Sequence, residues 1–461
     1  MLARGALLLV LAVLPGACSC DSSGSPGSPG SHTVRMTAWT IGPEPSSYTR
    51  KTNLLAGARR VERELAAAGQ GRRRPRTIDL TVDFATTTND AYARKLVFAF
   101  ASGNAPDIVC GGHELVGQLA AAGRLAPLDR LLAARPAFAN DFFPVLWTAV
   151  RHRGQVYGVP QDNEVRLTYL RADLLRRLGW SDAAVRDLPD RVAAGAFTLD
   201  DLADLAEQAV ARRVVARSSA IWHRTRTGTD WFAFLIAYGG RLQDMATGRL
   251  VVPRRATLDT LRLFDRLTDR GATPPGMVSY PNRTVYAGFV DGKVLAFLTG
   301  GSWHKLEWQT GFHIDDPTFA AEVQTIAIPT GRRGQPPVSV SHPLACMVNA
   351  RAADVELAFR VIQRSLDPDL DVAHALGSSH LVVRQSSGED AAYRRDPFLR
   401  RMMQLLRFTH FAPSHAKLPQ LQRILFEGIR GVEVGALSPD EALEFIDKVA
   451  RARLGDDVVV E

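Results

Sequence analysis

Cysteine is scarce in this sequence, with 4 residues among 461. Cys18 and Cys20 lie close to the N-terminus, so Cys110 and Cys346 are the two that remain for the folded body. These two form no C-x-x-C motif and no cluster with histidine, which argues against a structural zinc site and a thioredoxin-like redox site. The sequence therefore predicts neither a bound metal nor a cofactor.

Lysine is also scarce, since it occurs at only six positions and leaves arginine as 50 of the 56 basic residues. The arginines are scattered along the chain, and the one dense run, Arg72–Arg74, is typical of a solvated loop. The net charge of +8 is therefore not gathered into a phosphate-binding patch, and we expect no nucleic-acid partner. Abundant arginine, alanine, glycine and proline indicate GC-rich coding, as in actinobacteria.

The sequence has no apolar run that approaches the roughly 20 residues needed to cross a bilayer. The short apolar run over 6–14 follows a positive charge and precedes small residues and Cys18, which is the order of an export signal. We predict a signal peptide over 1–17, a lipid-bearing Cys18, and a flexible Ser/Gly/Pro linker over 18–32. Cys20 is a second candidate for the lipid, and an ordinary cleaved signal peptide is the alternative.

Export would bring the two remaining cysteines into an oxidising compartment. Cys110 and Cys346 then either form one disulfide or stay as two buried free thiols. The sequence leaves both alternatives open.

Catalytic signatures are missing as well. The chain contains no G-x-S-x-G elbow, no H-E-x-x-H helix, no phosphate-binding G-x-x-x-x-G-K-[ST] loop and no G-x-G-x-x-G fingerprint. Two S-x-x-K strings, 302–305 and 414–417, lack the companion motifs of penicillin-recognising serine enzymes. The chain is therefore not expected to be an enzyme.

Strand and helix patterns alternate over the first third of the chain, which indicates an α/β fold with a doubly wound sheet. The expected strands there are 34–40, 78–84 and 107–110, and the expected helices are 54–65, 92–100 and 114–122. Further on, the sequence predicts strands over 167–170, 294–298 and 323–327, and helices from Thr198 and over 256–270, 355–366 and 439–454.

Several runs resemble, in order and at compatible spacing, the bacterial extracellular solute-binding family that includes maltose-binding protein. The runs that carry this resemblance are 100–109 (FASGNAPDIV), 149–175 with its YGVP at 157–160, Gly239-Gly240, 289–303 with GGSW at 300–303, Ile328-Pro329, 381–384 and 438–443. Each run alone is weak, but their ordered coincidence from about residue 98 to the C-terminus is specific.

The resemblance implies a two-lobed, periplasmic-binding-protein-like α/β fold in which the chain crosses between lobes three times. One lobe would comprise 33–161 plus 345–397, and the other 164–343 plus 400–461. It also implies partners: a small sugar-like ligand, the permease subunits of an ABC importer, and the outer face of the cell membrane through the lipid anchor. The protein is expected to act as a monomer.

The expected strand ends of the first lobe offer suitable groups for a sugar. Ligands of open α/β sheets bind at the carboxyl ends of strands, and these ends hold 39–42, 86–89 and 111–114. The three segments carry short polar side chains with one aromatic ring and one carboxylate. A sugar stacks its C–H faces on rings while its hydroxyls pair with polar groups.

The resemblance transfers ligand contact to individual positions. His113-Glu114 matches a His-Asp pair, Asn163 with neighbouring Asp162 matches a glutamate at the first crossing, and Trp303 matches a stacking tryptophan. Gly111 replaces a stacking tryptophan of maltose-binding protein, which argues against maltodextrin. The full set of predicted ligand-binding residues is Trp39, Thr87, His113, Glu114, Asp162, Asn163, Trp231, Trp303 and Arg384.

Each of these residues also has a structural interpretation. The tryptophans, including Trp39 and Trp231, are either core or stacking residues, and Glu114 either contacts ligand or favours a helix N-terminus. Thr87 lies in a segment with an obvious N-cap. Asp162 and Asn163 are alternatively turn residues. Arg384 is alternatively a brace for the interlobe loop.

The sequence therefore predicts a binding lipoprotein that delivers an unchanged sugar or oligosaccharide to an importer. A glycerophosphodiester is the alternative ligand, because arginines near the cleft would receive its phosphate. A hypothesis from another class is an exported glycan hydrolase or lyase that uses Glu114 and Asp162 as an acid/base pair.

Overall fold

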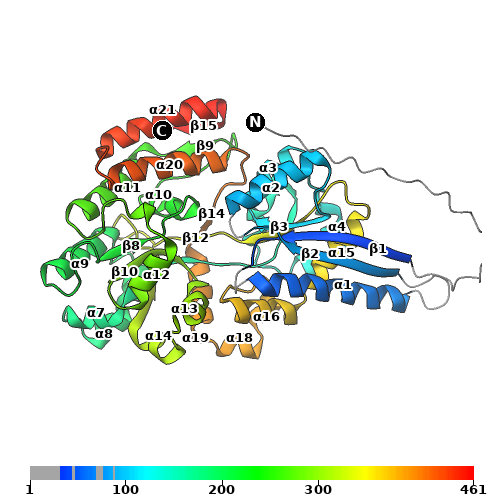
Figure 1. Ribbon diagram of the computed structural model, residues 1–461, viewed down its shortest axis with the longest axis horizontal. Helices are drawn as coiled ribbons and strands as arrows, with labels where there is room; N and C mark the ends of the chain where they lie inside the picture. Colours follow the sequence, from blue (N-terminus) through cyan, green and yellow to red (C-terminus); the bar gives the residue numbers. More distant parts are fainter. Residues whose placement is uncertain (1–31, 44–46, 69–75, 87–88) are drawn as a thin grey trace, which may run out of the picture.

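The computed structural model describes residues 32–43, 47–68, 76–86 and 89–461. It has two α/β lobes side by side, each built around its own sheet (Figure 1). The predicted signal peptide, the linker with Cys18, and Thr87 lie outside the described residues.

The first lobe contains a five-stranded sheet in the order β2-β1-β3-β13-β6. Its strands β1, β2 and β3 run parallel to one another, and β13 runs antiparallel to both β3 and β6. The strands are β1 (His32–Thr40), β2 (Arg76–Phe84), β3 (Ile108–Gly112), β6 (Gly158–Pro160) and β13 (Leu344–Val348).

Helices cover both faces of this sheet (Figure 1). They are α1 (Tyr48–Ala68), α2 (Asn89–Ser102), α3 (Leu115–Ala121) and α15 (Val355–Ser365), with the short α4 (Asp129–Ala133). Helices α1 and α15 pack closely at Gly57, where an added Cβ would lie 2.5 Å from the carbonyl oxygen of Val361. A glycine is therefore required for this approach.

The second lobe contains a four-stranded sheet in the order β11-β7-β10-β8, in which β7 runs antiparallel to both β10 and β11. Its strands are β7 (Arg166–Arg171), β8 (Ile221–His223), β10 (Ala296–Gly301) and β11 (Val323–Ile326). Its helices are α7 (Ala172–Arg177), α8 (Asp182–Ala193), α9 (Leu199–Ala211), α10 (Phe232–Ala237), α11 (Arg254–Asp269), α12 (Asn282–Val290), α13 (His304–Phe312), α14 (Asp316–Glu322), α20 (Leu418–Glu433) and α21 (Pro439–Leu454).

The predicted elements are confirmed where their signals are local. Helix α9 begins after Thr198, whose hydroxyl accepts from the backbone N–H of Asp201 while the Asp201 carboxylate accepts in return. Helix α21 begins after Ser438 with the same reciprocal arrangement to Glu441. Such capping boxes satisfy backbone donors that the first helical turn leaves unpaired.

The chain passes between the two sheets at two short segments, 161–165 after β6 and 342–343 before β13. A third connection runs through α16 (Pro368–Ser378), α18 (Ala391–Arg395) and α19 (Pro397–Leu405). Apolar side chains of these helices pack in one hydrophobic cluster with Tyr169 of the second sheet. Helix α16 also contacts α1 of the first lobe, so this segment lies between the lobes. The end of the first lobe at residue 397 therefore stays a prediction.

A buried ion pair in the second lobe gives stability a pH dependence. His223 at the end of β8 lies against Glu433 of α20 and donates its other ring N–H to the carbonyl of Arg224. Burial opposes the charged imidazole, but Glu433 outweighs it and raises the pKa of His223. The rings of Trp231 and Phe264 pack edge-on against the His223 ring.

We expect the free energy of unfolding to fall as the pH rises above neutrality. Because the folded pKa of His223 is raised, its stabilising contribution is complete below about pH 6.5 and is lost as the pH passes the folded value. Urea unfolding between pH 6 and 9 should show this loss in the unmodified protein and a smaller loss in Glu433→Gln. Equal pH dependence in both proteins would contradict the assignment.

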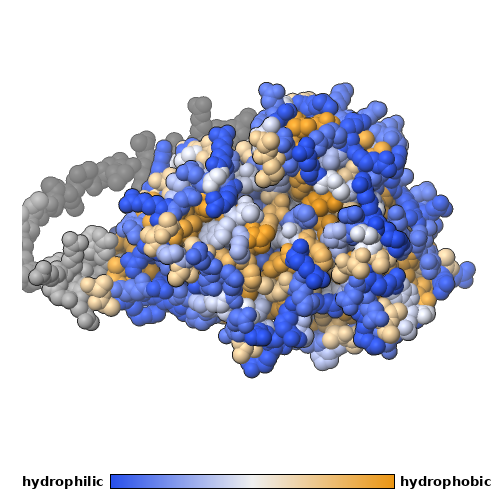
Figure 2. Space-filling model, turned by 180° about the vertical axis from the view of Figure 1, so that it is seen from behind, coloured by the Kyte–Doolittle hydropathy of each residue, from blue (hydrophilic) through white to orange (hydrophobic). Residues whose placement is uncertain are grey.

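No helix in the described part of the chain combines the length and apolar character needed to span a bilayer. Hydrophilic residues cover most of the face shown in Figure 2, and hydrophobic residues lie in recesses between them.

Candidate functional site

Asn163 ties together the segments that connect the lobes, which we call the hinge. Its backbone N–H and C=O pair with Leu381, and its side-chain oxygen accepts a hydrogen bond from the Ser341 hydroxyl at 2.9 Å. Asn163 is fully buried. These bonds tie the first crossing to the second crossing and to the segment that holds Leu381.

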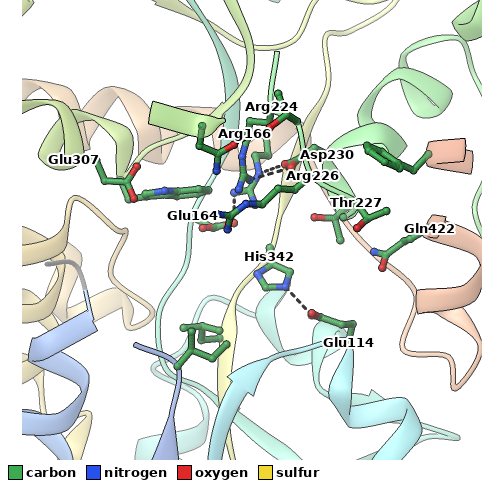
Figure 3. Close-up of a pocket in the computed structure, with 18 of the residues that line it drawn as sticks. Glu114, Glu164, Arg166, Arg224, Arg226, Thr227, Asp230, Glu307, His342 and Gln422 are labelled. Atoms are coloured by element: carbon green, nitrogen blue, oxygen red, sulfur yellow. Dashed lines mark hydrogen bonds and ion pairs between the residues drawn. The ribbon is translucent and has the colours of Figure 1, made fainter. Parts of the chain in front are cut away.

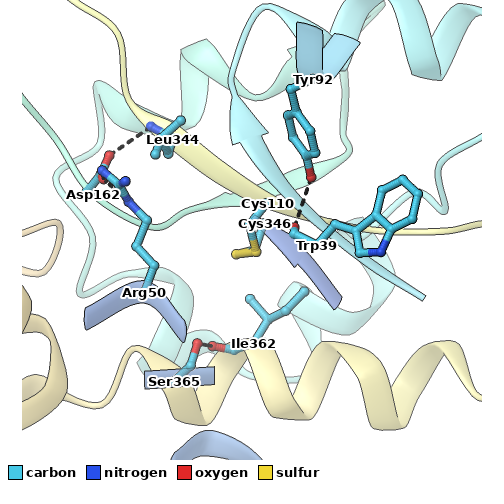
Figure 4. Close-up of a disulfide and its surroundings, with 9 residues drawn as sticks. All are labelled: Trp39, Arg50, Tyr92, Cys110, Asp162, Leu344, Cys346, Ile362 and Ser365. Atoms are coloured by element: carbon cyan, nitrogen blue, oxygen red, sulfur yellow. Dashed lines mark hydrogen bonds and ion pairs between the residues drawn. A yellow bond between two sulfur atoms is a disulfide. The ribbon is translucent and has the colours of Figure 1, made fainter. Parts of the chain in front are cut away.

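Asp162 has a similar role at the same crossing. One carboxylate oxygen accepts two bonds from the guanidinium of Arg50 on α1, and the other accepts the backbone N–H of Leu344 at 2.9 Å (Figure 4). Burial opposes the charge of Asp162, but Arg50 and the nearby His380 and His374 hold its pKa far below the usual range. This carboxylate is a buried, ionised hinge residue.

A cleft of about 770 Å³ lies between the lobes, beside these connections. Its walls come from both lobes and from the connecting segments (Figure 3). The lining residues are Ile41, Arg50, Arg94, Glu114, Glu164, Arg166, Arg224, Thr225, Arg226, Thr227, Gly228, Thr229, Asp230, Val278, Asn282, Tyr286, Trp303, Glu307, His342, Leu344, His380, Gln422 and Phe426.

A network of buried ions forms the wall on the second lobe. Arg166 of β7 donates to Glu164 and to Asp230, and Arg224 donates to the second oxygen of Asp230 at 2.9 Å (Figure 3). Burial opposes the Asp230 charge, but the two arginines lower its pKa, whereas burial raises the pKa of Glu164 despite Arg166. The wall thus presents fixed charges in a partly desolvated setting, where hydrogen bonds to a ligand are strong.

Trp303 follows β10 and lines the cleft with its half-buried ring. The Arg166 guanidinium lies 4.3 Å from the ring centroid, and the His380 ring stacks on it at 5.8 Å with an interplanar angle of 12°. A Cβ at Gly301 would lie 1.7 Å from the indole. Glycine at this strand end therefore lets the ring fold back toward the cleft.

The wall on the first lobe includes Glu114, which follows β3. Its carboxylate oxygen Oε2 lies 2.7 Å from Nε2 of His342 in the second crossing (Figure 3). Burial opposes the Glu114 charge, but His342 lowers its pKa to about 2, and Glu114 in turn raises the pKa of His342. This contact joins a strand end of the first lobe to the hinge.

Of the predicted ligand residues, Glu114 and Trp303 lie in the cleft lining. Trp39 packs at the edge of the first core with Lys95 over its ring at 4.4 Å, and Trp231 is buried among the rings of the second core. Arg384 bonds Asp141 and the carbonyl of Leu366, as a brace does.

His113 is fully buried and contacts the backbone of Ala412. It lies outside the lining of the cleft, as do Trp39, Asp162, Asn163, Trp231 and Arg384. Since Glu114 lines the cleft and Asp162 does not, the structure does not assemble the acid/base pair of the hydrolase hypothesis.

Cys110 and Cys346 are joined by a disulfide (Figure 4). They face each other on the antiparallel strands β3 and β13 at the centre of the first sheet. The disulfide thus ties the second crossing, which ends at β13, to the strand that leads to Glu114.

The sequence analysis did not predict most of the charged residues in the wall on the second lobe. Arg224 directly follows β8 and Arg226 lies two residues further on, so the rule that ligands bind at carboxyl ends of strands would have found them had this short strand been recognised. Glu164 lies one residue after the predicted Asn163, and Asp230 one residue before the predicted Trp231. His342 lies in a short connection without periodic pattern.

The model of the bacterial extracellular solute-binding protein family matches residues 78–363. A putative binding protein of Brucella abortus is 22% identical over 381 residues, which cover 81% of this chain and 85% of that protein.

Solved structures with sugar ligands are similar to this chain. The GacH receptor of Streptomyces glaucescens, solved unliganded and with acarbose, has a TM-score of 0.73 at 19% identity and covers 92% of this chain and 99% of its own. An ABC transporter solute-binding protein of Thermotoga lettingae, bound with α-D-tagatose, has a TM-score of 0.70 at 18% identity, over 91% and 99%. Maltose-bound MalE3 of T. maritima has 0.69 at 17%, over 90% and 98%.

Proposed function

The chain belongs to the bacterial extracellular solute-binding protein family, and we propose that it captures a sugar or oligosaccharide in its interlobe cleft and releases it unchanged. The observation that carries the proposal is the cleft itself, whose lining comes from both lobes and from the hinge. A ligand that contacts both lobes at once favours the closed arrangement over the open one.

The groups in this lining suit a polyhydroxylated ligand. Trp303, Tyr286 and Phe426 offer ring surface for C–H faces, and the buried carboxylates and guanidiniums offer hydrogen bonds for hydroxyls. Burial raises the pKa of Tyr286 to about 12, so its hydroxyl stays a hydrogen-bond donor at neutral pH. The sugar-bound structures that share this fold support the same class of ligand.

Delivery completes the proposed role. The protein would be held at the outer face of the cell membrane through a lipid on Cys18 and would pass its ligand to the permease subunits of an ABC importer. The Ser/Gly/Pro composition of the linker over 18–32 supports a tether of this kind.

A glycerophosphodiester is the second candidate ligand, and the arginines favour it. Arg94 and Arg226 line the cleft together with Arg50, Arg166 and Arg224. The last three have carboxylate partners, Asp162 for Arg50, Glu164 and Asp230 for Arg166, and Asp230 for Arg224. Exposed Arg226 is placed to receive a phosphate.

Calorimetric titration with mono-, di- and oligosaccharides and with glycerophosphodiesters tests the proposal. We expect saturable binding of a sugar, with the ligand recovered chemically unchanged by chromatography after release. Failure of every sugar to bind, or recovery of cleaved products, would contradict it.

Arg226→Gln separates the two candidates. A neutral sugar should keep its affinity within about threefold, because glutamine retains an N–H donor and an exposed neutral hydrogen bond contributes only about 0.5 kcal/mol, the low end of the usual range. A phosphodiester should lose about tenfold or more, since it loses a charge-assisted bond, and its binding should weaken with added salt. Tight, salt-sensitive phosphodiester binding that this variant abolishes would replace the sugar by the second candidate.

A further inference from the structure

Three side chains, those of His113, Glu114 and His342, lie close together beside the cleft, and the last two of them line it. Each of the three residues offers one ligand atom, and these atoms all lie within 4.8 Å of one another. Glu114 Oε2 is 3.7 Å from His113 Nδ1 and 2.7 Å from His342 Nε2. In a tetrahedral zinc site with bonds of about 2.0–2.2 Å, ligand atoms lie about 3.3–3.6 Å apart, so small side-chain movements would bring these three atoms to that spacing.

One ring nitrogen of His113 is held by the backbone, which orients the ring. Its Nε2 contacts the backbone carbonyl oxygen of Ala412 at 3.2 Å, a bond that needs the proton on Nε2 and leaves the Nδ1 lone pair free. His113 is 0% exposed, and its Nδ1 has no hydrogen-bond partner among the residues that the structure describes. A buried imidazole that donates one ring N–H to a backbone carbonyl and turns its other nitrogen toward a carboxylate is the usual arrangement of a metal ligand.

A second group of two histidines and one carboxylate does not leave its ligand atoms available in this way. Asp162, His374 and His380 also gather ligand atoms within 4.8 Å. However, the Asp162 oxygen nearest His374 accepts two hydrogen bonds from the Arg50 guanidinium. A fixed cation already occupies the position that a metal would take, so this group serves as an internal comparison.

From these contacts we infer that His113, Glu114 and His342 form a binding site for a divalent transition-metal ion, with Zn²⁺ as the ion that two imidazoles and one carboxylate suit well. Three protein ligands leave a fourth position of tetrahedral zinc for a water or another oxygen. Glu114 and His342 line the cleft, so that position faces the bound ligand. The site would also join the first lobe to the second crossing.

No sequence motif pointed to this site. Its ligands contain no cysteine. Along the sequence, all the strands of the second sheet lie between His113-Glu114 and His342. The motif spacings by which zinc sites are recognised are therefore absent. Only the pairing of β3 with β13 brings the three residues together.

Titration of the chelator-treated, dialysed full-length protein with Zn²⁺ tests the inference. We expect one Zn²⁺ per chain by calorimetry and native mass spectrometry. His113→Gln, Glu114→Gln and His342→Gln should each lower the affinity more than about 100-fold, because losing a ligand costs more than the 10- to 100-fold loss of a second-shell partner. His410→Ala, which removes an exposed histidine on β14 (Thr409–Phe411), and His374→Gln should keep it within about threefold.

Co²⁺ substitution adds a readout that does not depend on stability. Bound Co²⁺ should show the intense visible absorption of a tetrahedral site, and His113→Gln should abolish it while its far-UV circular dichroism stays native. Absence of stoichiometric Zn²⁺ binding, or binding that the three variants leave unchanged, would overturn the inference. Sugar titration of the chelated protein tests the proposed function separately, since the cleft residues of the second lobe need no metal.

Discussion

Replacing Trp303 by alanine is expected to weaken binding of the captured sugar about 100-fold, equivalent to about 2.7 kcal/mol. The ring lines the cleft, and it also carries the Arg166 guanidinium at 4.3 Å and that of Arg224 at 5.5 Å. The variant therefore loses its own contact area and frees two arginines that the ring now positions. Tryptophans in such central positions are typical binding hot spots. Calorimetric titration with the tightest sugar measures the effect.

Trp39→Ala is the matched control for this variant. Trp39 is also half-buried and was predicted as a ligand residue from its place at a strand end. It packs outside the cleft, however, with Lys95 over its ring. We expect its affinity for the sugar to stay within about twofold of the unmodified protein. Equal losses in both variants would show that Trp303 acts through general destabilisation and would contradict its assignment to the cleft.

Replacing Asp162 by asparagine should lower the free energy of unfolding by about 3–5 kcal/mol, because it leaves the Arg50 guanidinium buried without a counter-charge. The side chains of Arg50 and Asp162 are 6% and 1% exposed. The amide can still accept the backbone N–H of Leu344, so the loss reports on charge rather than on that bond. Urea unfolding followed by tryptophan fluorescence and circular dichroism measures it.

Asp369→Asn is the control for the buried pair. Asp369 also pairs with an arginine of α1, Arg60, but its side chain is 65% exposed. A solvent-exposed pair contributes at most about 1 kcal/mol, so we expect a change of that size or less. A loss for Asp162→Asn that does not exceed the loss for Asp369→Asn would contradict a buried, ionised hinge residue.

The fold was largely predictable because its signals are local. The capping box at Thr198 with the apolar periodicity after it, and the Ser-Pro signal at Ser438, each depend on residues a few positions apart. Strand-end reasoning likewise pointed to Glu114, and the family resemblance pointed to Trp303; both lie in the cleft. These predictions needed no knowledge of how distant segments meet.

Two further cleft residues, Glu164 and Asp230, lie one position away from residues that were predicted. Asp162 and Asn163 were predicted, but Glu164 faces the cleft; Trp231 was predicted, but Asp230 faces it. In extended or tightly turned backbone, consecutive side chains point in different directions. A motif match identifies the segment, whereas the packing of the hinge decides which neighbour reaches the ligand.

His342 is a cleft residue that could not be predicted from the sequence. It lies in a two-residue connection, and its significance comes from Glu114 and His113 at the end of a strand far away in sequence. Their approach depends on the β3–β13 pairing, which the Cys110–Cys346 disulfide reinforces. The sequence left that disulfide open for the same reason, because strand pairing at long range was not predicted.

A crystal structure of the protein saturated with its tightest-binding sugar tests the central claim most directly. We expect the intact sugar between the lobes, in contact with Trp303 on one side and with Glu114 or His342 on the other. A sugar bound on an outer surface, or one that contacts a single lobe only, would contradict capture by two hinged lobes.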